Sequence, residues 1–371
     1  MLLKIQVGLF RNALNKILSV VDKKNSRHIL TYTQVTAKDN VLELSATDLE
    51  VSAKITINAI VEKPGTICVN AKNIFDILRE LPEGEISFNV DLTENLLKIN
   101  CGDIFYSILV YKNDDFPHLI FENKGNEFTL TAKQTLEIIN KTSYAISNDE
   151  TRIFLNGIFL QEVDTKLRAV ATDGYRLSLI ETELNSFHNE NLINGIIIPR
   201  KGVYELKKLA ENYPDSALKL SVDDSFIYIN AENKYYLSIR LIAREYPKYQ
   251  EIIPSKTTYR MIADKTTIFD AVRRIKIMSN EKSNGVRLNI NGCELKFTAN
   301  HPSLGDAQEK LNVEYDGKSM EIGFNAKFLI ETLSSFDEGD ISIELNNELS
   351  PILIKSASLP NYLGIIMPLK F

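Results

Sequence analysis

The chain has 371 residues, 44% of them hydrophobic and 25% charged, with only 16 Gly and 11 Pro, which excludes a disordered or collagen-like chain. This length suits a globular protein of two or three domains. The formal net charge of −6 gives no general attraction to nucleic acid or acidic membranes, so any basic surface must be local. No apolar run approaches the roughly 20 residues that span a bilayer, and no signal segment opens the sequence, so we expect a cytoplasmic protein.

Three kinds of segment each occur three times along the chain. Amphipathic helices are predicted at 9–22, 131–146 and 264–278, alternating strands at 42–48, 167–173 and 295–301, and second helices within 70–88, 199–210 and 325–343. In the first helix the apolar stripe is Phe10, Leu14, Ile17, Leu18 and Val21. The sequence therefore predicts three repeats that together account for the whole chain.

Pro-containing segments end the first two repeats, near residues 123–126 and 255–258. We therefore expect three domains, at 1–124, 125–254 and 255–371. Strands such as 227–231 alternate apolar and polar residues, which indicates half-buried antiparallel sheets. Two amphipathic helices per repeat must cover these sheets, so the expected fold class is α+β.

Basic residues concentrate on the predicted helices, although the whole chain is acidic. The six helices at 8–24, 71–81, 131–142, 200–211, 264–276 and 326–335 carry a net charge of +8, so the rest of the chain carries −14. Such a basic layer suits contact with DNA phosphates, which does not depend on the base sequence, as in loose binding of duplex DNA. The alternative is that solvated helix faces are simply rich in lysine.

No motif of catalysis or metal binding stands out. The histidines His28, His118, His188 and His301 are scattered, and no nucleotide-binding or serine hydrolase motif is present. Asp48 and Asp173 hold equivalent repeat positions, which favours a turn-forming role but leaves a hydrolase as an alternative. Cys68, Cys101 and Cys293 are widely spaced, so we expect reduced thiols. We predict no catalytic residue, no metal and no cofactor.

Short segments spread over the full chain resemble the beta sliding clamps, the beta subunits of bacterial DNA polymerase III. The matching segments start at Thr47 (TDLE), Leu81 (LPEG), Asp115 (DFP), Leu155 (LNG), Ala171 (ATDGYRL), Pro199 (PRKGV), Ser279 (SNEK), Gly285 (GVRL) and Met367 (MPLKF). The resemblance implies three clamp domains with sheets outside and helices inside, closed as a head-to-tail dimer ring around double-stranded DNA. It implies a processivity subunit that is not itself an enzyme.

The resemblance also implies a groove for short partner peptides with apolar anchors. Its residues would be Leu155, Thr172, Gly174, Tyr175, Arg176, Leu177, Pro247, Ile252, Asn325, Phe328, Leu349, Ile365, Ile366, Met367, Pro368 and Leu369. Its partners would be the polymerase alpha subunit, the clamp loader, and other clamp-binding polymerases and repair proteins. Tyr175 stands where many members of the family have His, Glu251 where a basic residue is frequent and Ser283 where an aromatic can sit, and Phe371 replaces a terminal Leu.

Two further sets of residues follow from the resemblance. For DNA contact it points to Arg27, Lys72, Arg152, Arg200 and Lys201, with the neighbouring Ile153 and Phe154. For the ring seam it pairs Tyr106 and Ile108 of one subunit with Ile277 and Met278 of the other. A protein-binding scaffold built of repeats, without DNA encirclement, is the alternative function.

Overall fold

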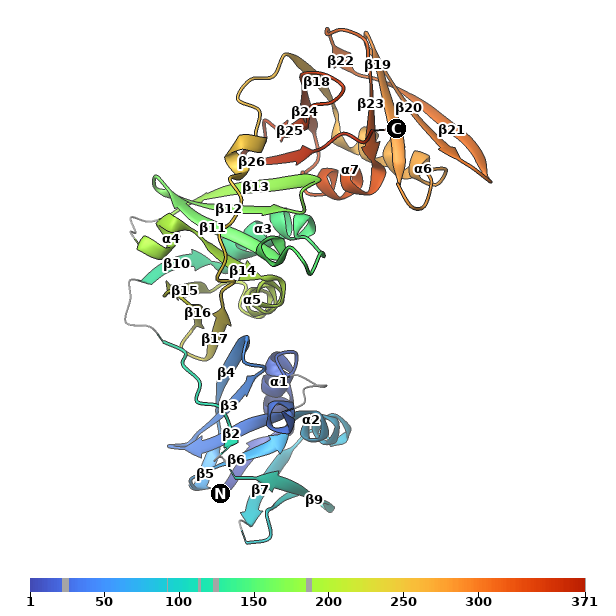
Figure 1. Ribbon diagram of the computed structural model, residues 1–371. Coiled ribbons are helices and arrows are strands. Elements are labelled where there is room, and N and C mark those ends of the chain that lie inside the picture. Colours follow the sequence, from blue (N-terminus) through green and yellow to red (C-terminus); the bar gives the residue numbers. More distant parts are fainter. Residues whose placement is uncertain (22–26, 92, 113–114, 123–126, 185–188, 371) are drawn as a thin grey trace. The chain divides into compact units, whose positions relative to one another are not determined.

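The computed structural model describes residues 1–371 except 22–26, 92, 113–114, 123–126, 185–188 and 371 (Figure 1). The described chain forms two compact units. Unit 1 is Met1–Leu136, Leu184–Asn191 and Lys201–Leu241, and unit 2 is Glu137–Glu183, Leu192–Arg200 and Ile242–Phe371. The expected boundary at 123–126 and His188 lie outside the described residues, and the three domain boundaries stay predictions.

Unit 1 is built on a sheet in which 13 described strands pair in antiparallel fashion. The strands are β1 (Leu2–Gln6), β2 (Tyr32–Lys38), β3 (Val41–Thr47), β4 (Val51–Asn58), β5 (Ile60–Lys63), β6 (Gly65–Asn70), β7 (Glu85–Asp91), β8 (Leu96–Cys101), β9 (Ile104–Tyr111), β10 (Glu127–Thr131), β15 (Ala217–Val222), β16 (Phe226–Ala231) and β17 (Tyr235–Arg240). Their spatial order is β10-β15-β16-β17-β4-β3-β2-β6-β9-β8-β7-β1-β5. The predicted alternation appears directly, because inward residues of β4 are buried and outward ones are half-exposed.

Helices α1 (Val7–Ile17) and α2 (Ala71–Glu80) lie side by side on this sheet, α1 against β1, β3 and β4 and α2 against β2 and β6 (Figure 1). The predicted extension of the first helix to residue 22 is wrong, because α1 ends at Ile17. Val20 and Val21 follow in a turn and are both buried, and such β-branched residues are weak helix formers. Asp22, Lys23 and Lys24, counted in the predicted helix, lie outside the described residues.

Unit 2 contains two antiparallel sheets in the described part of the chain. The nine-stranded sheet has the order β14-β11-β12-β13-β26-β25-β24-β18-β22, and the four-stranded sheet the order β21-β20-β19-β23. The strands are β11 (Gly157–Val163), β12 (Lys166–Thr172), β13 (Arg176–Glu183), β14 (Ile196–Pro199), β18 (Tyr259–Asp264), β19 (Gly285–Asn291), β20 (Glu294–His301), β21 (Gly305–Asn312), β22 (Glu314–Tyr315), β23 (Met320–Asn325), β24 (Asp340–Leu345), β25 (Ile352–Ser356) and β26 (Leu359–Ile366).

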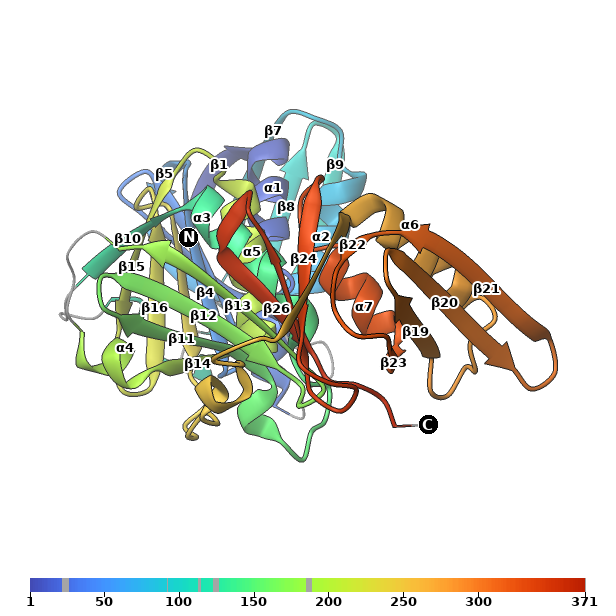
Figure 2. The ribbon, with the colours of Figure 1, turned by 90° about the horizontal axis from the view of Figure 1, so that it is seen from above.

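Helices α6 (Lys265–Lys276) and α7 (Ala326–Leu333) pack on each other and on the four-stranded sheet (Figure 2). Each begins with a side-chain cap, since Asp264 accepts from the N–H of Thr267 and Asn325 from those of Lys327 and Phe328. The chain passes between the units within α3 (Ala132–Thr142), within the short helix α4 (Glu190–Asn194) and at the start of α5 (Arg200–Asn212). It also does so after Glu183 and after Leu241. Short 3-10 turns occur at η1 (His28–Thr31), η3 (Ser143–Ala145), η4 (Ile153–Leu155) and η5 (Tyr249–Ile252). The six predicted helices are thus confirmed in type, but α3 and α6 end at Thr142 and Lys276, before the predicted 146 and 278.

Two strand pairings join one sequence repeat to the next, and we call them junctions. In the first junction β4 pairs with β17, and in the second β13 pairs with β26. Because each junction continues a sheet across two repeats, the compact units do not coincide with single repeats.

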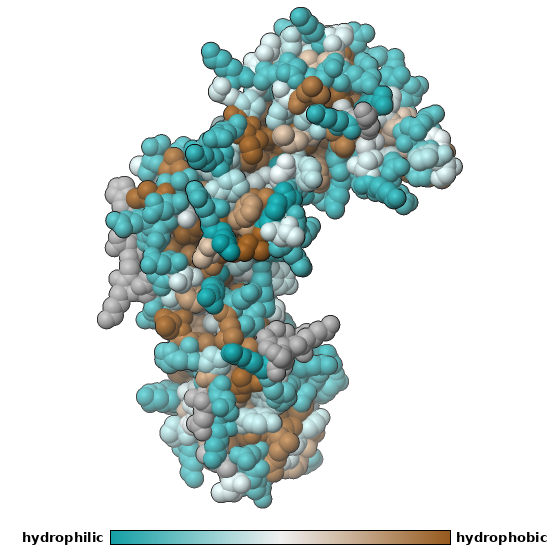
Figure 3. All heavy atoms as spheres, viewed as in Figure 1, coloured by the Kyte–Doolittle hydropathy of each residue, from teal (hydrophilic) through white to brown (hydrophobic). Residues whose placement is uncertain are grey.

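The visible face of the molecule has scattered apolar patches, and its three cysteines form no disulfide. On the face shown in Figure 3, hydrophobic side chains emerge in separate patches among hydrophilic ones. Cys68, Cys101 and Cys293 are free thiols, as predicted. Among the described residues, no helix is long and apolar enough to cross a membrane.

Candidate functional site

The turn between β12 and β13 positions four predicted groove residues, Thr172, Gly174, Tyr175 and Arg176. The Thr172 hydroxyl donates to the Arg176 carbonyl at 2.6 Å and accepts from the Gly174 N–H at 3.1 Å. Asp173 Oδ1 accepts from the N–H groups of Tyr175 at 2.9 Å and Arg176 at 3.1 Å. Gly174 has a φ of +88°, which glycine adopts without strain. Asp173 is therefore a turn former, as its repeat position predicted.

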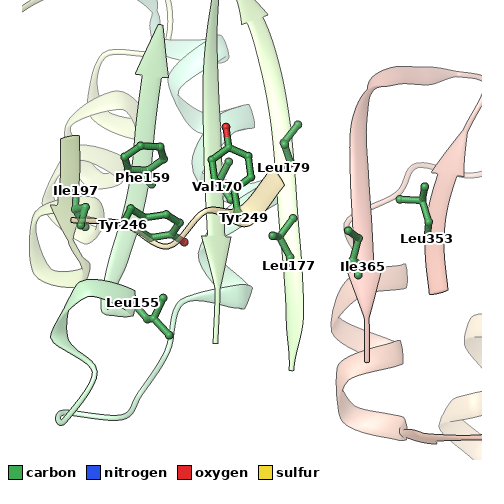
Figure 4. Close-up of a cluster of buried hydrophobic side chains, with 10 residues drawn as sticks. All are labelled: Leu155, Phe159, Val170, Leu177, Leu179, Ile197, Tyr246, Tyr249, Leu353 and Ile365. Carbon is green, nitrogen blue, oxygen red and sulfur yellow. The ribbon is translucent and has the colours of Figure 1, made fainter. Parts of the chain in front are cut away.

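Leu155, Leu177 and Ile365 lie together in one buried apolar cluster of unit 2 (Figure 4). Leu177 on β13 pairs with Ile365 on β26, and Ile365 pairs with Leu353 on β25. Leu177 is only 1% exposed. These predicted groove residues are thus buried side by side, and Ile366, also fully buried, follows Ile365 on β26.

The chain leaving β26 forms the exposed side of the predicted groove. The Met367 N–H donates to the Tyr175 carbonyl at 2.8 Å, and the Leu369 N–H donates to the Gly323 carbonyl at 2.7 Å. The tail therefore runs from the β12–β13 turn to β23. Met367 and Tyr175 are exposed, while Pro368, Leu369 and Phe328 are half-buried. Asn325, the cap of α7, also donates to the Ser283 carbonyl at 3.1 Å.

Three predicted groove residues lie at the margin of this arrangement. Ile252 is partly buried against the cluster. Pro247 is exposed in the segment before η5, where its carbonyl accepts from Tyr249 at 2.7 Å. Leu349 is exposed in the loop between β24 and β25. The structure thus brings most of the predicted groove together but leaves Pro247 and Leu349 in open loops.

Several residues under the groove were missed by the sequence reasoning. The ring of Tyr246 stacks on that of Phe159, with centroids 4.6 Å apart and planes 8° apart, and Tyr249 packs edge-on against both. The hydroxyl of Tyr249 bonds to Gln161 at 3.2 Å and accepts from Arg168 at 3.3 Å. The sequence did contain a signal for these contacts. Two tyrosines three residues apart, around a proline, can anchor such a segment to a sheet.

Arg176 is a buried charge that is fully compensated. It is 7% exposed, and its Nε donates to Asp173 Oδ2 at 3.1 Å. Its other nitrogens form an ion pair with Glu331 of α7 and donate to the Tyr144 carbonyl at 2.5 Å. Because a buried guanidinium is tolerated only with such partners, Arg176 ties the turn to α7.

The five cations predicted to contact DNA have different surroundings. Lys72 is exposed at the start of α2, and Arg27 is exposed before η1. Arg152 pairs with Asp149 at 2.8 Å. Arg200 donates to the carbonyls of Ile146 at 3.1 Å and Ser147 at 2.6 Å. Lys201 forms an ion pair with Asp48, so Arg152, Arg200 and Lys201 each hold a protein partner in this structure.

A polar network surrounds Lys201 in unit 1. Glu205 is 1% exposed and accepts from the Ser19 hydroxyl at 2.9 Å, and Lys208 donates to Ser19 at 2.7 Å. Burial raises the pKa of the Glu205 carboxyl, and burial lowers the pKa of the Lys208 ammonium. The network ties α5 to the segment that follows α1.

The six predicted helices keep their basic excess within the observed bounds. α1 and α5 each carry +2, α3 carries +1, α6 carries +3, and α2 and α7 are neutral, which again gives +8, while the short helix α4 carries −1.

The predicted seam residues lie beside two sheet edges, one in each unit. β9 pairs with β8 along its length, but with β6 only through Val110 and Tyr111. Within the described residues, the other edge of β9 is open over 104–109, with Tyr106 and Ile108 half-buried and Leu109 70% exposed. β21 is an edge strand of the four-stranded sheet. Ile277, which follows α6, is 73% exposed, and Met278 is half-buried.

The acidic residues singled out in the sequence lie in turns. Asp48 accepts from the N–H groups of Glu50 at 3.0 Å and Val51 at 2.7 Å, so it too forms a turn. Among the described residues, no group of three or more His, Cys, Asp or Glu side chains could hold a metal ion.

Comparison with known proteins identifies the family. Models of the three domains of the DNA polymerase III beta subunit match this chain: the N-terminal domain at residues 1–120, the central domain at 129–248 and the C-terminal domain at 250–370. The beta sliding clamp of Proteus mirabilis is 32% identical over 90% of this chain and 89% of its own length. That of Caulobacter vibrioides is 30% identical over the whole of both chains.

A solved structure of similar fold belongs to the same family as these relatives. The sliding clamp of Bartonella birtlesii, determined with griselimycin bound, superposes with a TM-score of 0.94 at 30% identity over the whole of both chains. Three matched domains, full-length relatives and this structural likeness all point the same way. The chain belongs to the beta sliding clamp family of DNA polymerase III: it is a DNA sliding clamp, an accessory processivity subunit that works with DNA and a polymerase and is not itself an enzyme.

Proposed function

We propose that two copies of this chain close head to tail into a ring that encircles double-stranded DNA. In this ring β9 of one copy pairs with β21 of the other, and Tyr106 and Ile108 meet Ile277 and Met278. The open edges of β9 and β21 support the proposal, because the unpaired N–H and C=O groups of an edge strand are a template for pairing with another chain. The two edges belong to different surfaces, so the contact is heterologous and occurs twice in a dimer.

DNA contact in this proposal is made through phosphates. Lys72, Arg27 and Arg200 are exposed, and Arg152 and Lys201 are half-buried. Arg152, Arg200 and Lys201 would contribute after exchanging or sharing their protein partners. Phosphate contacts carry no base information, so binding would not depend on sequence.

The groove in this proposal receives an apolar anchor of a partner peptide. The anchor would meet Leu155, Leu177 and Ile365 once exposed residues such as Met367 move aside, because these three side chains are buried. Partners would be the polymerase alpha subunit, the clamp loader, and other clamp-binding polymerases and repair proteins. Cytoplasmic location stays a prediction from the sequence.

Retention on DNA tests the ring. The clamp is loaded onto a nicked circular plasmid by a clamp loader, and half of the sample is then linearised. A closed ring stays on the circle and slides off the linear ends, and native mass spectrometry gives about twice the chain mass of 42.1 kDa. Equal retention on both forms would contradict encirclement, and no retention on either would favour the scaffold alternative.

A further inference from the structure

Asparagine followed by glycine is a pair of residues that can modify itself without an enzyme. The backbone nitrogen of the glycine attacks the carbonyl carbon of the asparagine side chain, and the missing Cβ of glycine leaves that approach unhindered. The attack requires a glycine N–H that is free of hydrogen bonds and open to water, so the fold decides which pair reacts. The sequence contains four such pairs, which begin at Asn156, Asn194, Asn284 and Asn291.

The fold holds three of these four pairs in place. The Gly195 N–H donates to the Leu192 carbonyl at 3.2 Å, and the Gly285 N–H donates to the Ser283 hydroxyl at 3.2 Å. Gly157 is buried at the start of β11, where an added Cβ would collide with the backbone of β14. In each of these pairs the glycine nitrogen is bonded or enclosed.

The fourth pair, Asn291 and Gly292, lies open at the turn between β19 and β20 (Figure 2). Both residues are exposed, and an added Cβ on Gly292 would meet no atom within 4 Å. Within the part of the chain that the structure describes, the Gly292 N–H has no hydrogen-bond acceptor. The turn is anchored one residue later, where the Cys293 carbonyl accepts from the Val313 N–H at 2.9 Å. The nucleophile of this pair is therefore free in an ordered turn.

Ser319 acts on the other partner of the reaction. Its hydroxyl donates to Asn291 Oδ1 at 2.8 Å. This oxygen takes up negative charge when the glycine nitrogen attacks, and a donor already aimed at it stabilises that charge. The structure thus combines a free nucleophile with a polarised carbonyl at this one turn.

We propose that Asn291 deamidates spontaneously in the folded protein, faster than the other three asparagines. A bond forms between Gly292 N and Asn291 Cγ, the proton of the Gly292 N–H passes through water to the side-chain nitrogen, and the Cγ–Nδ2 bond breaks as ammonia leaves. Water then opens the cyclic imide at either of its two carbonyls, which gives aspartate or isoaspartate. Water is the one reactant consumed, and nothing is oxidised or reduced.

The product weakens the end of the β19–β20 hairpin. Asn291 pairs with Glu294 across the two strands, and Glu294 forms an ion pair with Lys310 at 3.0 Å. A carboxylate at position 291 lies opposite that of Glu294, and like charges directly opposite each other destabilise a strand pair. Isoaspartate also adds a carbon to the backbone beside the turn, which sets the register of the hairpin.

Peptide mapping by mass spectrometry tests the proposal. The full-length protein is incubated at mildly alkaline pH, once folded and once in guanidinium chloride, and the four asparagines are followed over time. In the folded protein Asn291 should react about two- to tenfold faster than Asn194, because the bond on the Gly195 N–H must first open. Asn194 is the matched control, since it is exposed as well. In denaturant the two rates should be similar.

Variants of Ser319 test the role of its hydroxyl. Ser319→Ala should slow the reaction of Asn291 about two- to tenfold in the folded protein and leave it unchanged in denaturant. Ser319→Thr keeps a hydroxyl and should keep the rate. Equal rates for Asn291 and Asn194 in the folded protein would overturn the proposal. An unchanged rate in folded Ser319→Ala would overturn the role of the hydroxyl, and a rate that does not rise with pH would exclude attack by the glycine nitrogen.

Discussion

The two junctions share one backbone design but differ in the side chains that they carry. The turn before β4 has the same hydrogen bonds as the turn before β13: Thr47 bonds to Val51 and Leu49 as Thr172 does to Arg176 and Gly174. Asp48 and Asp173 each accept two turn N–H groups. The left-handed position is Leu49 in the first junction, with a φ of +76°, and Gly174 in the second.

Along the paired strands that follow these turns, the two junctions carry different side chains at equivalent positions. Where Leu177 faces Ile365 in the second junction, Ser52 faces Ser238 in the first. One step further, Leu179 faces Leu363, whereas Lys54 faces Tyr236 and lies 4.6 Å from its ring centre. The first junction is thus polar on the face where the second has its apolar cluster. The buried apolar cluster is therefore a property of a few side chains on a repeated scaffold, and it is where we propose the groove for apolar anchors.

The same comparison extends to the seam, which we propose as a third junction, formed between chains. Ile277→Ala with Met278→Ala should give monomers, because each deletion of a buried side chain costs about 2 to 5 kcal/mol and the seam occurs twice. Sedimentation at micromolar concentration measures the mass.

Folding of the monomer should be unaffected in this double variant, since Ile277 is 73% exposed within one chain. The control is Ile60→Ala with Ile120→Ala, two exposed isoleucines outside the proposed seam. An intact dimer at micromolar concentration would exclude Ile277 and Met278 from the seam.

Leu177→Asp tests the difference between the junctions directly. A carboxylate replaces a fully buried leucine, so we expect unfolding to become easier by about 3 to 5 kcal/mol and peptide affinity to fall more than tenfold. The matched change, Ser52→Asp, should cost less than about 1 kcal/mol and leave peptide affinity unchanged. Urea unfolding and fluorescence anisotropy provide the two measurements.

A truncation separates groove loss from loss of folding. Removing residues 367–371 deletes the exposed side of the groove and leaves β26 intact. Peptide affinity should fall at least tenfold, because an apolar anchor contributes about 1.5 to 3 kcal/mol. The native mass should stay that of a dimer. Unchanged affinity in both the truncation and Leu177→Asp would contradict the groove assignment.

Substitutions of Lys72 and of Lys201, which is paired with Asp48 beside the first junction, should differ in how much they weaken DNA binding. Lys72→Glu should weaken DNA association equally for all sequences and reduce the salt slope by about one. Lys201→Ala should have a smaller effect on DNA and a larger one on folding, because it leaves the buried Asp48 carboxylate without its ion pair.

Filter binding over a salt series with two unrelated duplexes measures the DNA effect, and urea unfolding measures stability. The combined Arg200→Glu and Lys201→Glu variant should weaken both. A loss that depends on DNA sequence would contradict contact through phosphates.

The sequence was sufficient for those features that local patterns determine. The three repeats, the helices and the turn role of Asp48 and Asp173 were predicted, because hydrophobic spacing and Asp side chains act over a few residues. The end of α1 was not, because the apolar spacing continues through Leu18 and Val21 although the helix stops at Ile17. The ion pair of Lys201 with Asp48 joins residues 153 apart in sequence. Only the strand pairing of β4 with β17 reveals why that lysine is not a free cation.

The smallest expected effect is on the pH dependence of stability. It concerns Glu205 on α5, near the first junction, and its repeat equivalent Glu331 on α7. Glu205 is 1% exposed, whereas the Glu331 side chain is 32% exposed. Burial raises the pKa of Glu205 above its ordinary 4.5, although the Ser19 hydrogen bond and Lys208 oppose this. An acid whose pKa rises on folding stabilises the folded chain fully below pH 4.5, and this stability is lost as the pH rises through the raised pKa.

Glu205→Gln removes this titration and keeps an acceptor for Ser19. The unfolding free energy of the variant, relative to wild type, should therefore increase as the pH rises from 4.5 towards neutrality. Ser19→Ala should make the wild-type decline steeper, because it deletes a bond that favours the charged carboxylate. Urea unfolding at half-unit pH steps measures all three proteins. If the unfolding free energies of Glu205→Gln and wild type differ by the same amount at every pH in this range, burial of Glu205 does not disfavour its charge. The contrast between the two junctions would then be limited to apolar packing.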